Sequence, residues 1–466
     1  DFTEEQLAAL LVGYGSGIPF AGFLDTAFPE TICDKEGKPL TCNDHPAGHN
    51  GYVSPAIKDK GIHSVFYMDG PAGIGRTAWP TEMLLACAFN KEAWYRFGEA
   101  VGAECEEAQV DVWLAPAVNL HRNPLCGRNF EYFSEDPLVS GRMAGAITRG
   151  VQTIPGKGTT IKHFACNNQE DNRMGADSVV GERALREIYL RGFQYAIEET
   201  QPKALMTSYN LINGVHSANS YDLCTVSARK EWGYDGAVIS DWGGVHDTVA
   251  AAESELDLEM SITFNFDDYC MANPLKKAVE DGKVKEKHID KKVANLLRLM
   301  YRLKMLPGTG ERKKGCFHSF EHIKAARKTA EESVILLKND KTLLPLKLDS
   351  QVAVIGRNAT AIHSNGGGSA EIKAIYEVTP LRALMNVCGG DTRFVYEPGY
   401  VLPDKDDAQD ESWQETSLEN AGSRKEESVD EALMARIDEY RQRAVKLARE
   451  NRQTIIFAGL NHDYDI

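Results

Sequence analysis

Short apolar runs that end in polar residues, each followed by an amphipathic stretch, constrain the fold of this chain more than any other feature. The runs HSVFYM, VDVWLAP, GTTIK, KALMTS and GAVIS lead to Asp69, Asn119, His163, Tyr209 and Asp241. Segments 89–108 and 180–199 carry apolar residues at three- and four-residue spacing, as helices do. Because this alternation of strands and helices runs for about 300 residues, it predicts a (β/α) barrel or an open doubly wound sheet.

In either architecture the carboxyl ends of the strands carry the functional groups, because the loops there converge on one crevice. Polar residues follow the strands of this chain repeatedly. A single polar residue at such a place can equally be the cap of the next helix. The repetition, rather than any one residue, indicates a site at this rim.

A chain of 466 residues exceeds the size of a single hydrophobic core. We predict a barrel over 1–306, a Gly-, Pro- and Lys-rich linker over 307–320, and a second α/β unit over 321–466. The second unit is expected to contain a helix at 321–338, strands at 351–356 and 454–460, a further strand in TRFVYEPG and a helix at 429–450. Segments 34–55 and 403–428 have the composition of loops.

The composition excludes several classes of partner. The net charge of −16 repels phosphate backbones and anionic lipids, so we expect neither nucleic acid nor membrane as a partner. No apolar run approaches the length of a membrane span, and the N-terminus lacks the layout of a secretory signal. The ten cysteines form no C-x-x-C pair. We therefore expect a soluble, cytoplasmic protein, or a secreted one if a leader has been removed.

Hydrolysis of a glycosidic bond needs two carboxyl groups, and a sugar pocket adds charged and aromatic groups that hold hydroxyls. VISDW places Asp241 at a strand end, followed by Trp242, whose face can support a sugar ring. Lys162 and His163 follow another strand and are interpreted as a cationic pair that needs anionic neighbours or ligand oxygens. A buried ion pair that serves only stability is the alternative for these two residues.

Several motifs in this order resemble glycoside hydrolase family 3. The first-domain motifs are DGPAGIGR, GRNFEYFSEDP, KHFACNNQEDNR, LREIYLRGF, MTSYNLINGV and SDWGG, and the second-domain motifs are AEESVILLKND, LLPL, VAVIG and GGGS. They extend over nearly the whole chain. The resemblance implies a (β/α) barrel followed by an αβα sandwich, with a sugar pocket between them.

Position by position, the resemblance implies a catalytic nucleophile at Asp241 and a carboxylate at Asp69 that holds distal hydroxyls of the sugar. It also implies that other positions line the same pocket: Arg76, Arg128, Lys162, His163, Arg173, Met206, Tyr209, Trp242 and Ser369. Arg76 follows one more Gly than the usual spacing. For Met206 and Tyr209, plain core packing is the alternative.

The family's general acid/base is a Glu in a stretch like E-G-x-D-R after the strand that here reads TIIFAGL. The chain ends at NHDYDI, and Asp463 and Asp465 do not fit that motif. We therefore expect the αβα sandwich to be incomplete and the acid/base to lie just after Ile466. The expected partners are small β-glucosides or oligosaccharides and the remaining C-terminal part of the same protein, possibly as a separate chain.

The resemblance favours a retaining, exo-acting β-glucosidase that works without a cofactor or metal. β-Xylosidase is a rival within the family, whereas the absence of a KHFPGHG-like stretch argues against a β-N-acetylglucosaminidase. A carbohydrate-binding protein without catalysis is an alternative of another class. VAVIGRNA could indicate a nucleotide-dependent enzyme, but no G-x-G-x-x-G follows it. The His spacing does not favour a metal enzyme.

Overall fold

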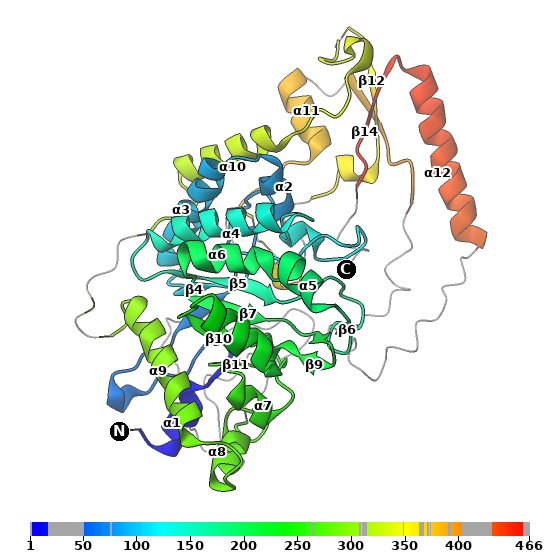
Figure 1. The fold of residues 1–466 in the computed structure, drawn as a ribbon. Coiled ribbons are helices and arrows are strands. Elements are labelled where there is room, and N and C mark those ends of the chain that lie inside the picture. The colour runs from blue at the N-terminus through cyan, green and yellow to red at the C-terminus, as the bar shows by residue number, and fades with distance from the viewer. Residues whose placement is uncertain are drawn as a thin grey trace.

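The chain forms a barrel followed by a smaller sheet domain (Figure 1). The computed structural model describes residues 2–16, 51–74, 77–261, 265–306, 309, 315–347, 349–362, 368–370, 372, 374–389, 393–401 and 431–459. The expectations for Arg76, for the segment 403–428 and for most of 34–55 lie outside these residues. None of the described helices combines the length and the apolarity needed to cross a lipid bilayer.

Eight strands make the barrel. They are β1 (Val12–Ser16), β2 (Gly51–Val53), β3 (Phe66–Met68), β4 (Val112–Trp113), β5 (Gly158–Phe164), β7 (Ala204–Thr207), β10 (Ala237–Ile239) and β11 (Glu259–Met260). Their order is β10-β7-β5-β4-β3-β2-β1-β11. A bridge between Ile239 and Leu258 joins the two ends of this sheet, and the Ser240 N–H donates to the Leu258 carbonyl at 2.9 Å. The predicted barrel is confirmed, and its sheet is nearly closed.

One part of the barrel departs from the predicted alternation. β2 pairs antiparallel with both β1 and β3, and it lies at 51–53, where a loop was expected. The prediction was wrong here because Asn, Gly, Ser and Pro surround Tyr52 and Val53, so no apolar run marks this strand. From β3 through β10 the neighbouring strands are parallel, so their carboxyl ends meet at one rim.

Helices surround the barrel, and α3, α4 and α6 lie side by side over the flank that contains β4, β5 and β7 (Figure 1). The first-domain helices are α1 (Glu4–Leu10), α2 (Glu82–Cys87), α3 (Lys91–Glu107), α4 (Pro137–Gln152), α5 (Glu182–Ala184), α6 (Arg191–Thr200), α7 (Thr248–Glu253), α8 (Asn273–Glu280) and α9 (Glu286–Arg302). Asn90 and Asp136 cap α3 and α4 by accepting N–H groups of the first turn. The helix expected at 180–199 contains a π-helical turn at Leu185–Tyr189. A small sheet of β6 (Asp177–Ser178), β8 (Leu211–Ile212) and β9 (Val215–His216) lies beside the barrel.

The second unit is a parallel sheet in the order β13-β12-β14. Its elements are α10 (Phe320–Ser333), β12 (Val352–Ile355), α11 (Pro380–Cys388), β13 (Phe394–Glu397), α12 (Glu431–Glu450) and β14 (Gln453–Ile456). α10 lies against α2 and α3 of the barrel (Figure 1). The helix expected to reach residue 338 ends at Ser333, because Val334 adopts an extended backbone (φ −74°, ψ 118°) and begins a run of branched apolar residues. The boundaries at 306 and 321 stay predictions.

Glycines allow α3 and α4 to approach closely. A Cβ added to Gly98 would lie 2.2 Å from the Ile147 carbonyl oxygen, and one added to Gly150 would lie 2.2 Å from the Tyr95 carbonyl oxygen. Backbone atoms of neighbouring helices cannot move aside as a flexible side chain can. The close contact between α3 and α4 therefore requires glycine, which has no side chain, at both positions.

We predict that Gly98→Ala destabilises the protein by about 1–3 kcal/mol, because its methyl group overlaps the α4 backbone. The free energy of unfolding in urea measures the effect. Gly181→Ala is the matched control: a Cβ at Gly181 meets nothing within 4 Å, and its φ of −68° suits alanine. The control should change stability by less than about 0.5 kcal/mol. Equal losses in both variants would contradict the close-approach argument.

Candidate active site

Asp69, Lys162, His163, Tyr209 and Asp241 lie at or just beyond the carboxyl ends of β3, β5, β7 and β10. All five side chains are largely buried. Their interactions, described below, connect all four strands at one rim. The arrangement matches the expected position of a site in a barrel.

Asp241 carries one engaged and one free carboxylate oxygen. Oδ1 accepts the Trp242 backbone N–H at 2.9 Å. Oδ2 is buried, has no hydrogen-bond partner among the described residues, and lies 3.7 Å from His163 Nε2. Burial raises the pKa of Asp241 above its ordinary value, whereas Arg128, Arg173 and Lys162 act to lower it. The charge on this carboxyl group therefore depends on three nearby cations.

His163 is neutral, so the interpretation of Lys162 and His163 as a cationic pair is wrong. Burial and the charges of Arg128, Lys162 and Arg173 hold the pKa of His163 well below its usual range. Nε2 lies 2.9 Å from Arg128 Nη2 and Nδ1 lies 3.2 Å from the Tyr132 hydroxyl. Because arginine can only donate, Nε2 accepts and Nδ1 carries the proton. Two hydrogen bonds with Asn119, at 2.8 and 2.9 Å, fix the His163 backbone.

Lys162 forms an ion pair with Asp69. Its Nζ lies 3.2 Å from Asp69 Oδ1, and both side chains are mostly buried. Burial raises the pKa of Asp69, and Lys162 opposes that shift. Tyr52 lies close enough to Asp69 and Asp241 for both carboxylates to raise its pKa, although burial is the larger cause. Tyr52 comes from the three-residue strand β2, so no sequence motif indicated it.

Two arginines form a charge network with two glutamates that the sequence analysis did not select. Arg128 Nε donates to Glu131, and Arg173 Nη1 donates to Glu170 Oε2 at 2.9 Å. Glu170 Oε1 lies 4.0 Å from Arg128 Nε, so Glu170 connects both guanidinium groups. Both glutamates fall within the quoted motifs GRNFEYFSEDP and KHFACNNQEDNR. Each glutamate lies three residues from an arginine in the sequence, and this spacing could have indicated the two ion pairs.

Tyr209 and Trp242 contact residues of the same cluster. The Arg173 guanidinium lies 4.8 Å from the centre of the Tyr209 ring, and burial followed by the Asp241 charge raises the pKa of Tyr209. The Trp242 ring lies 4.3 Å from that of Tyr52, and its buried indole N–H has no partner in the part of the chain that is described. Met206 lies on β7 and belongs to the main hydrophobic core.

Arg76 and Ser369 are the two remaining predicted residues. Arg76 lies outside the described residues. Ser369 is exposed in the turn Gly368–Ala370, and among the described residues no hydrogen bond or ion pair joins it to the barrel. Its neighbour Ile372 does reach the barrel, because a Cβ added to Gly70 would lie 3.7 Å from Ile372 Cδ1. The second domain thus approaches the loop that follows Asp69. Among the described residues, no group of three or more His, Cys, Asp or Glu side chains could hold a metal ion.

Two family profiles match the chain. "Glycosyl hydrolase family 3 N terminal domain" covers residues 56–299, and "Glycosyl hydrolase family 3 C-terminal domain" covers residues 334–465. The chain belongs to glycosyl hydrolase family 3. The resemblance inferred from the motifs is thereby confirmed.

Relatives within family 3 include thermostable β-glucosidase B of Acetivibrio thermocellus, which is 34% identical over 90% of this chain and 53% of its own length. An exo-α-(1→6)-L-arabinopyranosidase of Bifidobacterium longum is 36% identical over 70% of this chain and 45% of its own length. The family 3 β-glucosidase structure from Bifidobacterium adolescentis aligns with all of this chain and 58% of its own (TM-score 0.73, 31% identity). β-Glucosidase 3B of Thermotoga neapolitana in complex with α-D-glucose covers 97% of this chain and 56% of its own (TM-score 0.71, 31% identity). The chain spans about half the length of these relatives.

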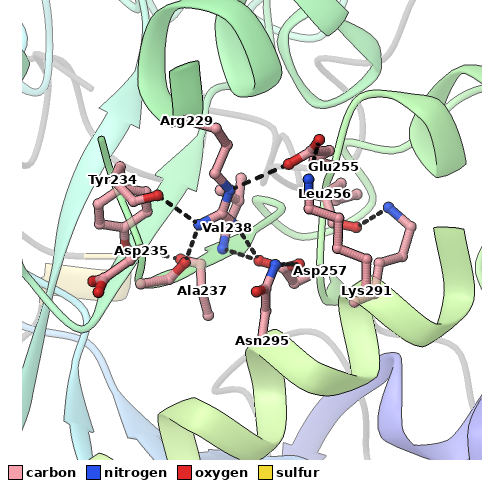
Figure 2. Close-up of polar contacts among 12 residues, drawn as sticks. Arg229, Tyr234, Asp235, Ala237, Val238, Glu255, Leu256, Asp257, Lys291 and Asn295 are labelled. Carbon is pink, nitrogen blue, oxygen red and sulfur yellow. Dashed lines mark hydrogen bonds and ion pairs between the residues drawn. The ribbon is translucent and has the colours of Figure 1, made fainter. Parts of the chain in front are cut away.

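A buried network holds the start of β10, the strand that leads to Asp241 in this family 3 barrel (Figure 2). Asp257 Oδ2 accepts Arg229 Nη2 at 2.5 Å and the Val238 N–H at 2.8 Å, and Oδ1 accepts Asn295 Nδ2 at 2.8 Å. Arg229 also donates to the Gly236 carbonyl at 2.5 Å. The network therefore holds the strand before Asp241 through the N–H of Val238 and through the carbonyl of Gly236, the residue that precedes the strand.

We predict that Asp257→Asn destabilises the family 3 barrel by about 3 kcal/mol, because it removes the nearer carboxylate of the buried Arg229 charge and leaves only Glu255, 3.7 Å from Arg229 Nε. The free energy of unfolding in urea measures this loss. Asp235→Asn is the matched control, since Asp235 pairs with Arg302 at the surface and is about half exposed. An exposed pair contributes about 0–1 kcal/mol. A loss of similar size in the two variants would contradict the role given to the buried network.

Proposed function

We propose that this chain supplies the sugar-binding barrel and the nucleophile of a retaining, exo-acting β-glucosidase. The observation that carries the proposal is Asp241 Oδ2, a buried carboxylate oxygen with no partner among the described residues at the rim of a family 3 barrel. An unpartnered buried oxygen is costly unless a ligand engages it. The β-glucosidases among the relatives support this choice of reaction.

The proposed reaction is a double displacement. Asp241 Oδ2 forms a bond to the anomeric carbon while the glycosidic carbon–oxygen bond breaks, and the leaving oxygen takes the electron pair and a proton from an acid. Water, deprotonated by the same group, then attacks the anomeric carbon and releases Asp241. Two substitutions at one carbon leave the configuration unchanged.

The charged residues around Asp241 suit a neutral sugar. We propose that Asp69 and Lys162 bind hydroxyls far from the anomeric carbon, since their ion pair offers an acceptor and a donor. Arg128 and Arg173 stabilise the Asp241 carboxylate, and neutral His163 adds no charge beside it. The free indole N–H of Trp242 is a donor for the ligand. Arg76, Met206, Tyr209 and Ser369 stay predicted pocket residues.

The described carboxylates of the cluster are poor candidates for the general acid. Asp69 pairs with Lys162, Glu131 with Arg128, and Glu170 with Arg173. A general acid must carry a proton, which a neighbouring cation disfavours. We propose that the acid/base is a glutamate in polypeptide beyond Ile466. The greater length of the relatives is consistent with this.

An exposed apolar segment of the second domain supports the proposal that further polypeptide of this protein binds to the chain. Val334, Leu336 and Leu337 expose 78%, 63% and 93% of their surfaces, and Leu343 is exposed nearby. Contiguous apolar surface of this kind marks an interface. We propose that the remaining part of the same protein covers it, either in the same chain or as another chain. The free cysteines of the described part fit a reducing compartment such as the cytoplasm.

The substrate is proposed to be a terminal β-D-glucosyl residue. The arabinopyranosidase relative makes aryl α-L-arabinopyranosides a necessary comparison, and aryl β-xylosides test the other rival. The preferred substrate is the one with the highest kcat/KM. Calorimetric binding of glucose without any turnover in the extended protein would favour a carbohydrate-binding protein instead.

We predict that Asp241→Asn abolishes the release of phenolate from 2,4-dinitrophenyl β-glucoside. This leaving group needs no proton, so the nucleophile can be tested without the acid/base. The wild-type chain should release a burst of up to one phenolate per chain, and the variant should be slower by at least about a thousandfold. Rapid-mixing absorbance measures the burst.

Asp235→Asn, at the surface pair with Arg302, is the control and should keep the full burst. Mass spectrometry of the wild-type burst should show one hexosyl group on the peptide that contains Asp241. A burst that survives in Asp241→Asn would disprove the assignment of the nucleophile.

We predict that Glu170→Gln weakens glucose binding about tenfold, equivalent to about 1.4 kcal/mol. The variant removes the shared counter-charge of Arg128 and Arg173, so both guanidinium groups shift from their positions beside Asp241. Calorimetry on the extended protein measures the dissociation constant. Glu187→Gln, at an exposed pair with Arg183, is the control and should bind as the wild type does. Unchanged affinity in folded Glu170→Gln would show that Glu170 does not position the arginines.

A further inference from the structure

Cys316, His322 and Glu104 form a chain of contacts where α10 meets α3, outside the strand-end cluster. Cys316 Sγ lies 3.8 Å from His322 Nε2. His322 Nδ1 lies 2.8 Å from Glu104 Oε1. A thiol, an imidazole and a carboxylate thus follow one another in the order used by nucleophilic sites, where the acid orients the base and the base serves the nucleophile.

Burial differs along this chain of contacts. Cys316 is exposed, whereas His322 is buried and Glu104 is fully buried. Glu104 Oε1 also accepts the Thr77 hydroxyl at 2.6 Å, and Oε2 has no partner among the described residues. A carboxylate accepts from Nδ1–H, so the Nε2 lone pair of His322 faces the thiol. The nucleophile is open to solvent, while the groups that orient its base are shielded.

The backbone holds Cys316 in place. Its N–H donates to the Ala103 carbonyl at 3.3 Å, at the end of α3. A Cβ added to the preceding Gly315 would lie 2.3 Å from the Glu107 nitrogen, so the chain is packed directly on the helix. The thiol is therefore held beside His322 and is not on a freely moving loop.

The structure assigns Cys316 as a reactive thiol that forms mixed disulfides with small disulfide molecules, with His322 as the proton acceptor and Glu104 as the positioning residue. Cys316 Sγ gives its proton to His322 Nε2 and forms a bond to one sulfur of the disulfide. The sulfur–sulfur bond of the reagent breaks, and the second sulfur leaves as a thiolate. Cys316 is oxidised, the released thiol is reduced, and His322 returns its proton to solvent.

The other described cysteines make poor competitors. Cys105, Cys126, Cys166 and Cys224 are buried, and Cys87, Cys270 and Cys388 are partly covered. Burial raises the pKa of Cys105 and of Cys166 to about 12 and that of Cys270 to about 11, which keeps these thiols protonated. Selectivity for Cys316 therefore follows from exposure as well as from the histidine. None of these groups enters the proposed sugar pocket, so this inference is independent of the glycosidase proposal.

The test is the rate of reaction of the native 466-residue chain with 5,5′-dithiobis(2-nitrobenzoate). Absorbance of the released thiolate gives the rate, and mass spectrometry of peptides locates the modified cysteine. We expect Cys316 to react first and roughly tenfold faster than the same cysteine in the protein unfolded in urea, because His322 assists deprotonation. Cys316→Ser should remove the fast phase.

His322→Gln should slow the native Cys316 reaction roughly tenfold, as loss of the proton acceptor requires. His318→Gln is the matched control, because His318 lies on the same segment but packs against Tyr376. In urea the wild type and both variants should react alike. A native Cys316 no faster than the unfolded one, or equal rates in folded His322→Gln and wild type, would overturn the assignment. If His322→Gln does not fold, the comparison of native with unfolded wild type decides alone.

Discussion

The balance of buried charge around Asp241 is the constraint on which the site depends. Burial alone would favour the protonated carboxyl group, and Arg128, Arg173 and Lys162 oppose it. Those cations are themselves buried and need carboxylates of their own: Glu131 and Glu170 for the arginines, Asp69 for the lysine. Burial, together with the three cations, holds the pKa of His163 well below its usual range and keeps the ring neutral. A change to any one of these groups therefore alters the ionisation of the others.

The barrel makes this concentration of charge possible. The parallel strands from β3 to β10 bring residues distant in sequence to one rim, and the network of Arg229 and Asp257 anchors the strand before Asp241 from the opposite end (Figure 2). The two ends of β10 thus have separate tasks. One end bears a buried carboxylate oxygen without a partner among the described residues, while the polar groups at the other are largely satisfied within the protein. This division is characteristic of barrel enzymes.

Sequence patterns predicted the elements that lie in clear apolar runs and missed one that does not. The strand before Asp241 lies in the apolar run GAVIS, and α3 has apolar residues at helical spacing. β2 was missed, and Tyr52 with it, because Asn, Gly, Ser and Pro surround its few apolar residues. The end of α10 was placed too late because the exposed run from Val334 to Leu337 is as apolar as a buried helix face. Apolar residues usually indicate a buried segment, but none of the described residues covers this run.

The site shows a similar limit. Family motifs identified the positions of Asp241, Lys162 and Arg173, but protonation is a property of the assembled cluster. From its place next to Lys162 in the sequence, His163 was interpreted as a cation. In the folded protein its burial and three neighbouring cations lower its pKa and make it neutral. Glu170 was passed over for the same reason, because its importance comes from lying between two arginines that are 45 residues apart in sequence. Sequence motifs can therefore locate a site, whereas the charge that each group carries follows from the contacts that folding creates.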